Sequence, residues 1–218
     1  MLSTRIDDGY FHDKGFEAIC HCALRILEAL EPVHNNGYLH LDISPDNIHF
    51  SDLKIARLID YNSAYHVSEP SEQLSFSIKE GYSANELMVR SSANTPVISR
   101  ATDLFSVSAI IFEMLVHRRL GEDDWSMPSL WYLNNFSGYL DGASELLVRK
   151  TNAFLKKGIS LASHGRFQSV QEMRSAIEEL LHLKTTVDLI HSVRDFNSYF
   201  VCRDTEMKQI EQMLEQIT

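Results

Sequence analysis

A stripe of apolar residues runs along the first part of the chain, where such residues recur at intervals of three and four positions from Lys14 to about Asn35. This spacing places them on one face of a long amphipathic helix. The helix is expected to end at the turn-forming sequence Asn-Asn-Gly at 35–37. The stripe consists of Phe16, Ile19, Ala23, Ile26, Leu27, Leu30 and Val33.

Three short strand-like runs follow this helix, at 38–40, 48–50 and 55–59. The last two are separated by the turn-like Ser51-Asp52, which predicts a β-hairpin. Residues 40–47 therefore form a loop between two strands.

The rest of the chain is mostly helical in pattern. Residues 62–83 are rich in serine without sustained periodicity, which indicates a long surface segment. Helical patterns follow at about 101–117, 143–157 and 169–182; the pattern then weakens after Lys184 until a last apolar stripe at 204–217. The predicted fold class is mainly α with a small β-hairpin (α+β). We expect one domain at 1–182, and a linker with a terminal amphipathic helix at 183–218.

Charge and composition narrow the possible partners. The 218 residues include 30 acids and 20 bases, a formal charge of -10, which argues against nucleic acid or an anionic membrane as the main partner. No apolar run is long enough to span a bilayer, and no charged-then-apolar leader opens the chain. Cys20, Cys22 and Cys202 cannot all pair and are interpreted as reduced thiols. A cytoplasmic protein fits both observations.

The candidate chemistry lies in the loop and just after the hairpin. Asp42 and Asn47 are five positions apart, and a hairpin would return Asp60 to the side of Asn47. Transfer of a phosphoryl group from a nucleotide requires oxygen ligands for a divalent metal and a carboxylate beside the acceptor hydroxyl. These three side chains supply both. Taken alone, the D-x-x-x-x-N spacing is more often a turn aspartate and an asparagine cap.

Several motifs then occur in the order found in one enzyme family. Residues 40–47, HLDISPDN, are similar to the catalytic loop H-R-D-L-K-P-E-N, residues 60–62, DYN, to the metal-binding D-F-G, and residues 84–86, ANE, to A-P-E. Residues 102–107 are similar to the D-x-W-S-x-G opening of a long buried helix, and Arg166 fits a late arginine of the family. Over residues 1–182 the chain thus resembles the eukaryotic-type (bacterial Hanks-type) Ser/Thr protein kinases, and of these the helical C-lobe alone.

The resemblance implies roles for the matched residues. Asp42 would be the catalytic base, and Asn47 and Asp60 would hold Mg²⁺ with ATP. The implied reaction transfers the γ-phosphate of ATP to a Ser or Thr hydroxyl of a protein substrate.

Other matched residues would be structural. Glu86 and Arg166 would form an ion pair, and Asp103 would anchor the catalytic loop backbone from below. His40 is expected to be a packed histidine. Tyr61 replaces the phenylalanine of D-F-G and still offers a ring to stack beneath the regulatory helix.

Departures from the family pattern lie in the same region. Leu41 replaces the arginine that receives a phosphorylated activation loop in many kinases, so we expect no switching of that kind. Ser44 replaces the catalytic-loop lysine, and we hypothesise that Lys79 reaches into the site and restores the lost charge. His49 lies under the expected adenine position, where the family prefers an aliphatic residue. Asn62 replaces the glycine of D-F-G and tolerates the positive φ of that turn.

A kinase N-lobe is missing from the pattern. No G-x-G-x-x-G precedes His40, and the 39 residues before it cannot hold a glycine-rich loop, a lysine strand and a glutamate helix. We therefore expect the isolated chain to bind nucleotide poorly and to be inactive alone. Three explanations remain. The chain would be a fragment of a longer kinase, a C-lobe kept as a scaffold, or a C-lobe whose N-lobe comes from another polypeptide. The first is favoured. Residues 200–207, FVCRDTEM, also resemble the F-V-G-R-E-x-E-L box that opens bacterial signalling ATPase modules.

The predicted function is thus that of a Ser/Thr protein kinase. A non-catalytic, pseudokinase-like scaffold and a small-molecule phosphotransferase of the aminoglycoside or choline type are the alternatives. The scaffold needs no metal ligands, and the small-molecule enzymes lack the A-P-E-like segment. Self-association through exposed C-lobe surface is a further expectation.

Overall fold

The computed structural model describes residues 1–51, 55–69, 76–88, 98–121, 124 and 145–199, without the side chains of 12–13 and 187–199. This part of the chain is mostly helical, with two antiparallel sheets of two strands each. Within the described ranges, no helix has the length and apolar character required to cross a membrane.

Helix α2 (Tyr10–Asn35) carries the predicted apolar stripe and follows the short helix α1 (Leu2–Asp7). Gly15 interrupts α2 with φ 74° and ψ -173°, so the continuous helix begins at Phe16, close to the predicted start. The stripe is largely buried in the core. The helix ends at the predicted Asn-Asn-Gly turn, where Gly37 has φ 79°.

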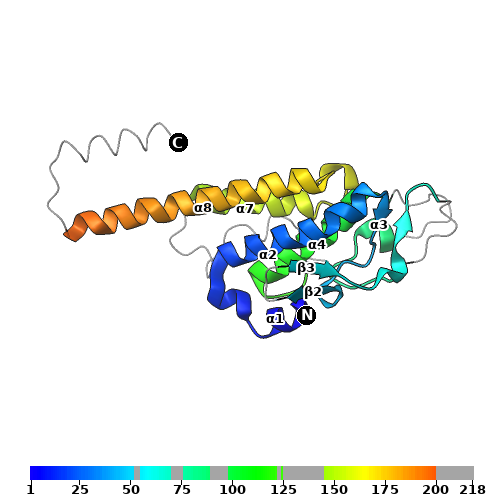
Figure 1. Cartoon of the computed structure of the whole chain (residues 1–218). Coiled ribbons are helices and arrows are strands. Elements are labelled where there is room, and N and C mark those ends of the chain that lie inside the picture. The colour runs from blue at the N-terminus through cyan, green and yellow to red at the C-terminus, as the bar shows by residue number, and fades with distance from the viewer. Residues whose placement is uncertain (52–54, 70–75, 89–97, 122–123, 125–144, 200–218) are drawn as a thin grey trace.

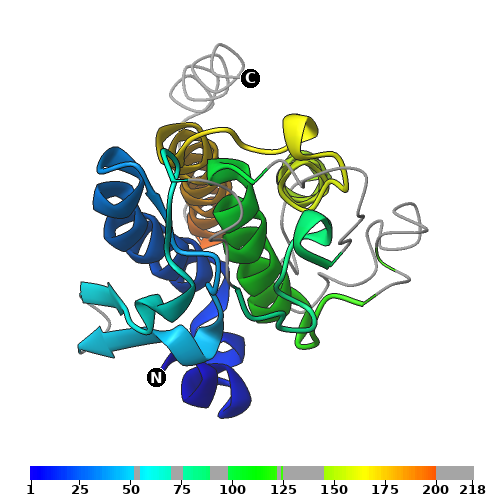
Figure 2. The same ribbon diagram turned by 90° about the vertical axis from the view of Figure 1, so that its right-hand side faces the viewer.

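Helix α4 (Arg100–Val116) is the centre of the molecule, with α2 on one side and α7 (Glu145–Gly158) on the other (Figure 2). A capping box formed by Ser99 and Thr102 starts the helix. Every residue from Ala101 to Leu115 is buried, as expected of a helix that other helices surround. The predicted helices at 101–117 and 143–157 are therefore confirmed.

The loop that carries the candidate chemistry lies between the two sheets. Strands β2 (Ile48–Ser51) and β3 (Ile55–Leu58) form the predicted antiparallel hairpin. Strand β1 (Tyr38–Leu39) pairs with β4 (Tyr65–His66), which lies inside the segment expected to be a surface loop. With two residues, β4 is too short to show the alternation by which a strand is recognised.

Helix α8 (Val170–Tyr199) is longer than the predicted helix at 169–182. Its first part packs against α2 and α7, and its last part projects from the body (Figure 1). The linker expected from residue 183 is therefore helical as far as residue 199. No glycine or proline occurs at 183–199, so the backbone has no reason to stop there. The predicted terminal helix at 204–217 lies outside the described residues.

Two of the cysteines belong to the core. Cys20 and Cys22 are free and buried, as expected of reduced thiols, whereas Cys202 lies outside the described residues. Burial raises the pKa of both thiols to about 12. Because the thiolate is the reactive form, neither residue is suited to nucleophilic chemistry.

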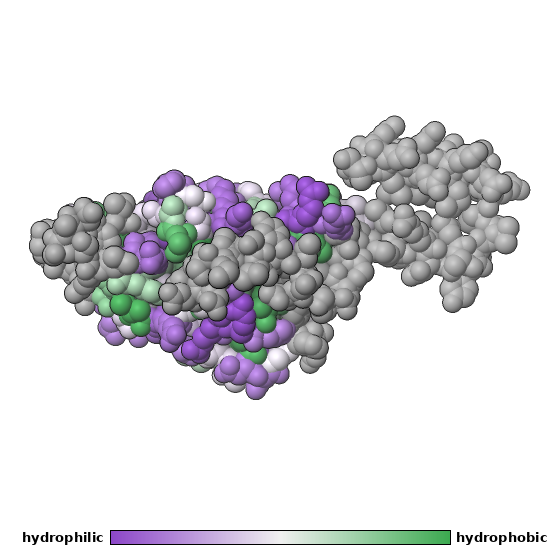
Figure 3. All heavy atoms as spheres, turned by 180° about the vertical axis from the view of Figure 1, so that it is seen from behind, coloured by the Kyte–Doolittle hydropathy of each residue, from purple (hydrophilic) through white to green (hydrophobic). Residues whose placement is uncertain are grey.

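Apolar side chains also reach the surface, mixed with hydrophilic ones on the face shown in Figure 3. Tyr38, Ile55 and Tyr61 are 44%, 55% and 49% exposed, and all three belong to the sheets or to the turn beside them. An apolar groove of about 470 Å³ lies there between α2 and the two tyrosines. It is lined by Ala29, Pro32, Val33, Asn36, Tyr38, Tyr61 and Ala64.

Candidate active site

The loop at 40–47 folds around its own asparagine. Helix η1 (Pro45–Asn47), a 3-10 turn, closes the loop, and Asn47 N–H donates to Ser44 O at 2.9 Å. Asn47 Nδ2 donates to Asp42 O at 2.8 Å. This bond uses the nitrogen of the amide and leaves its oxygen as the atom that a cation would take. The spacing of five residues thus corresponds to one hydrogen-bonded turn in which both side chains are buried.

The hairpin brings Asp60 to this loop. Ile59 N–H donates to Asn47 O at 3.0 Å, one step beyond the β2–β3 ladder, and Asp60 is the next residue. Asp60 has φ 61° and its Oδ1 accepts from Asn62 N–H at 3.4 Å. The positive φ expected at Asn62 is therefore wrong: Asp60 adopts it, and its short side chain binds the turn that follows. Asp60 is exposed to solvent.

Lys79 reaches the same loop from a distant segment. Its Nζ donates to Ser44 Oγ at 2.9 Å and lies 3.3 Å from Asp42 Oδ1. Its main chain is held as well, because Lys79 N–H donates to Ser83 Oγ at 2.8 Å and Lys79 O accepts from Ser83 N–H at 2.9 Å. The structure thus brings an ammonium group beside the carboxylate and the hydroxyl of the loop.

Asp103, in the first turn of α4, holds the main chain of the loop from below. Its Oδ1 accepts from Leu41 N–H and its Oδ2 from His40 N–H, both at 2.9 Å. Leu41 has φ 59°, which is unfavourable for a leucine and persists only where the surroundings impose it. Asp103 is 1% exposed and supplies this constraint.

Glu86 and Arg166 form a two-bonded ion pair with N···O distances of 2.7 and 2.8 Å. Arg166 is 1% exposed and also donates to Leu161 O at 2.9 Å, while Thr102 Oγ1 donates to Glu86 Oε1 at 2.8 Å. The buried guanidinium is therefore both neutralised and hydrogen-bonded. The pair connects α3 (Asn85–Met88) to the chain just before α8.

The oxygen donors around the loop fit a magnesium ion shared with a phosphate ligand. Within the described ranges, no cluster of three or more His, Cys, Asp and Glu side chains that could hold a metal ion occurs. Mg²⁺ does not need such a cluster, because it usually takes one or two carboxylates and completes its shell with phosphate oxygens and water. The Asn47 amide oxygen and the solvent-exposed Asp60 carboxylate are hard donors of the required kind.

A model of one known protein family matches residues 5–182, a range that includes the loop, the hairpin and helices α2, α4 and α7. The description of this family is "Protein kinase domain". The chain belongs to the protein kinase family. Its mostly helical described part, with small antiparallel sheets, has the protein-kinase fold.

Curated proteins similar to this kinase chain match only part of it. It is 34% identical over 98 residues to cyclin-dependent kinase F-3 of Oryza sativa subsp. japonica, covering 45% of this chain and 22% of that protein. It is 28% identical over 117 residues to serine/threonine-protein kinase ppk23 of Schizosaccharomyces pombe, covering 53% and 28%. It is 34% identical over 102 residues to the phosphorylase b kinase gamma catalytic chain, liver/testis isoform, of Bos taurus, covering 43% and 25%. The chain thus spans about a quarter of the length of these relatives. All three are eukaryotic, and a bacterial origin stays a prediction.

The remaining predicted residues of the kinase site divide by exposure. His40 is fully buried, its ring centroid lies 4.8 Å from that of Tyr61, and burial lowers the pKa of the imidazole. Tyr61 is half-exposed and faces the apolar groove. His49 is exposed on the outer face of β2. Tyr61 and His49, the two residues expected to contact the N-lobe or the nucleotide, are thus exposed to solvent.

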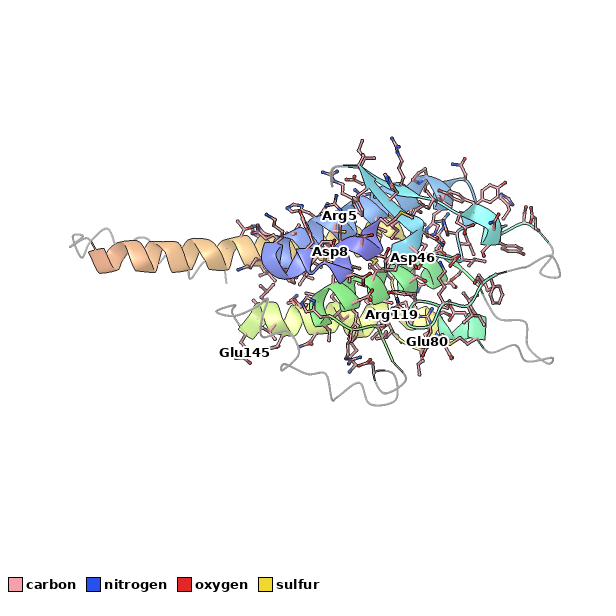
Figure 4. All side chains as sticks on the ribbon, turned by 90° about the horizontal axis from the view of Figure 1, so that it is seen from below. Arg5, Asp8, Asp46, Glu80, Arg119 and Glu145 are labelled. Atoms are coloured by element: carbon pink, nitrogen blue, oxygen red, sulfur yellow. The ribbon has the colours of Figure 1, made fainter. Side chains whose placement is uncertain are left out.

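His34 and Glu113 are among the buried polar residues that sequence reasoning missed. His34 is 2% exposed and hydrogen-bonded to Asp103; its place one turn after Leu30 on the apolar stripe was the available signal. Glu113 accepts a hydrogen bond from Tyr82 Oη at 2.6 Å inside the apolar run of α4, and burial raises the pKa of its carboxyl. Glu113 lines a cavity of about 100 Å³ with Asp46 and Arg119, which lie on the same side of the molecule in Figure 4.

Proposed function

We propose that the chain supplies the catalytic loop and the metal ligands of a Ser/Thr protein kinase that transfers the γ-phosphate of ATP to a protein hydroxyl. The observation that carries this proposal is that the ammonium group of Lys79 meets the carboxylate and the amide of the catalytic loop, with Asp60 one residue beyond the hairpin contact to Asn47. Similarity to proteins named as serine/threonine kinases supports the class of acceptor.

Asp42 would act as the base. The main chain around it is held on both sides. Asp42 O accepts from Asn47 Nδ2, and the N–H groups of the two preceding residues donate to Asp103. Asp42 would take the proton of the acceptor hydroxyl as the hydroxyl oxygen bonds to the γ-phosphorus and the bond from that phosphorus to ADP breaks. The direction of the carboxylate matters because a base can take the proton of the substrate hydroxyl only from within hydrogen-bond distance of that hydroxyl.

Asn47 and Asp60 would hold Mg²⁺ through their side-chain oxygens. When bound there, the metal supplies positive charge that neutralises the phosphate oxygens. The two ligands differ in environment, since Asn47 is buried in the loop and Asp60 is open to solvent. Asn47 would therefore fix the position of the ion, and Asp60 would face the incoming nucleotide.

Lys79 would supply the positive charge that the loop lacks because Ser44 stands in place of the catalytic-loop lysine. Its side chain is 29% exposed and its Nζ lies within hydrogen-bond distance of Ser44 Oγ, so the ammonium group can turn towards a phosphate without leaving the site. Fixed cations beside a transferring phosphate stabilise the charge of the transition state, and removal of one such group typically lowers turnover about 100-fold or more. Lys79→Ala should show a loss of that size and Lys79→Arg a smaller one; unchanged turnover in Lys79→Ala contradicts this role.

In this proposal, residues 1–182 are the C-lobe of the kinase and 183–218 follow it as an extension. The N-lobe comes from elsewhere in cis or in trans, and the substrate is a protein of the cytoplasm. The 218 residues alone would then have no measurable transfer activity. A bacterial signalling protein is the context that the short motif at 200–207 favours.

Phosphate transfer from radiolabelled ATP to a general Ser/Thr protein substrate tests the proposal. The isolated chain should not exceed the background set by Asp42→Asn, and addition of a kinase N-lobe polypeptide should produce Mg²⁺-dependent transfer that Asp42→Asn and Asp60→Asn each abolish. Transfer that survives Asp42→Asn contradicts the assignment of the base. Transfer by the isolated chain that Asp42→Asn abolishes contradicts the need for an N-lobe. A folded chain that stays inactive after N-lobe addition and fails to bind Mg²⁺ favours the scaffold.

A further inference from the structure

Asn152, in the middle of α7, is a buried side chain without a partner for either of its polar atoms. It is 6% exposed, and neither its Nδ2 nor its Oδ1 makes a hydrogen bond in the described part of the chain. The neighbouring Thr151 is also buried, but its hydroxyl donates to Leu147 O at 2.9 Å, one turn back. Burial of an unpaired amide costs free energy, so packing alone does not account for an asparagine at this position.

The unpaired amide borders a cavity of about 770 Å³. All of the described residues that line this cavity belong to α7, which lies on the side of α4 opposite α2 (Figure 2). Figure 4 labels Glu145, the first residue of α7, well away from Asp46 of the catalytic loop. The cavity is therefore distinct from the candidate active site. Its volume is in the range of sites that hold drug-sized ligands and is far larger than a single inorganic ion.

The cavity carries positive charge, although the formal charge of the whole chain is -10. The charged residues that line it are three bases and one acid, namely Arg149, Lys150, Lys156 and Glu145. Lys150 is paired with Glu179 at 2.8 Å. Arg149 lies one turn before Asn152 and Lys156 one turn after it. Because residues three and four positions apart share a helix face, the amide lies between two cations.

We propose that this face of α7 is a docking site for an acidic segment of a partner protein, bound in an extended conformation. An amide offers both donors and an acceptor, the complement of the C=O and N–H of a peptide unit. A carboxylate or phosphate only accepts and would leave Oδ1 of Asn152 unpaired. An extended segment has free main-chain groups for this pairing, and its acidic side chains would meet Arg149 and Lys156. The docking site does not depend on the proposed kinase activity.

Fluorescence anisotropy of fluorescein-labelled hexaglutamate, titrated with the 218-residue chain at low ionic strength, tests the site. Binding should be saturable, and Asn152→Leu should weaken it about 10-fold, as for the loss of one or two hydrogen bonds. Arg149→Met should weaken it by at least as much. Lys157→Met, the control, removes the same charge from the same helix outside the cavity and should bind as the native chain does. No saturable binding, or equal losses of affinity in Arg149→Met and Lys157→Met, overturns the proposal.

Hexaglutamate methylated at its main-chain nitrogens separates pairing with the peptide unit from attraction between charges. The native chain should bind the methylated peptide about 10-fold more weakly than the unmethylated one, and Asn152→Leu should bind the two equally. Equal affinity of the native chain for both peptides overturns the proposal. Displacement of the peptide by inorganic phosphate at constant ionic strength would assign the face to a simple anion and overturns it as well.

Urea unfolding without peptide shows whether the amide is unpaired in the free chain. Asn152→Leu should have the same urea midpoint as the native chain or a higher one, because the leucine fills the space and leaves no polar atom unpaired. A lower midpoint would mean that the amide has partners within the chain, and overturns the proposal. Self-association of the native chain that Asn152→Leu abolishes would assign this face to a second copy instead, and overturns it too.

Discussion

The two sides of the catalytic loop differ sharply. On the side that faces α4, the polar groups are buried and hydrogen-bonded, as in the contacts of Asp103 and in the ion pair of Glu86 with Arg166. On the side that faces away from α4, Asp60 and His49 are exposed. The difference shows that the scaffold fixes the loop before any ligand arrives, while the groups expected to meet nucleotide remain free to bind it.

The largest effect is expected at Arg166, on the buried side. Arg166→Met leaves the Glu86 carboxylate in place without its partner, and we expect the free energy of unfolding to fall by about 3–5 kcal/mol. Urea unfolding followed by circular dichroism measures this change. Lys150→Met is the control, because the pair of Lys150 with Glu179 is exposed and should contribute about 1 kcal/mol or less. Equal losses of unfolding free energy in the two variants would contradict the claim that the buried ion pair contributes more to stability than the exposed one.

A matched pair of aspartates sharpens the comparison. Asp103→Asn places a donor where the carboxylate accepts from two main-chain N–H groups, and should lower the free energy of unfolding by about 1–3 kcal/mol. Asp60→Asn changes an exposed residue and should stay within about 0.5 kcal/mol of the native chain. Thermal and urea unfolding of both variants measure the difference. The contrast fails if Asp60→Asn is the more destabilising of the two.

The pH dependence of stability reports on His40. Burial lowers the pKa of His40 below its ordinary value, so between the two values the unfolded chain binds a proton that the folded chain does not. Stability should therefore fall as the pH drops below about 6.5, by at most about 1.4 kcal/mol per pH unit from this residue. Urea unfolding between neutral and mildly acidic pH should show a smaller slope in His40→Phe than in the native chain. An identical slope would mean that His40 takes up its proton equally in both states.

A small effect on stability is also expected at Lys79, which connects the two sides. Its ion pair with Asp42 is partly exposed, so Lys79→Met should change the free energy of unfolding by about 1 kcal/mol or less. Urea unfolding of this variant beside Arg166→Met gives the measurement. A loss as large as that of Arg166→Met would place Lys79 among the structural residues.

The elements that could be predicted from the sequence are those with a long periodic pattern or a local turn signal. The stripe of α2 and the buried α4 have enough residues to show a helical period, and the turn-forming residue types at Ser51-Asp52 separate the two strands of the hairpin in the sequence. The length of α8 was missed because residues beyond 183 lose the stripe without gaining a helix breaker. β4 was missed because its two residues are too few to show the alternation of a strand.

The candidate site was predicted from side-chain types, and the family resemblance also predicted the contact of Asp103 with the loop and the ion pair of Glu86 with Arg166. The spacing of Asp42, Asn47 and Asp60 could be read directly, because those groups must sit on adjacent turns. The positive φ at Asp60 and the contact of His34 with Asp103 depend on how distant helices pack, which no local pattern reports. The roles of the site residues stay predictions until the experiments above are made.

Paramagnetic broadening by Mn²⁺, used in place of Mg²⁺, tests most directly the claim that the open side of the loop binds a divalent metal. In nitrogen-15 spectra of the 218-residue chain, the amide signals of Asn47, Ile59 and Asp60 should broaden at the lowest Mn²⁺ concentrations. Asp60→Asn should remove this effect while leaving the rest of the spectrum unchanged. Broadening that begins at other acidic residues, with the hairpin signals unaffected, would contradict the account.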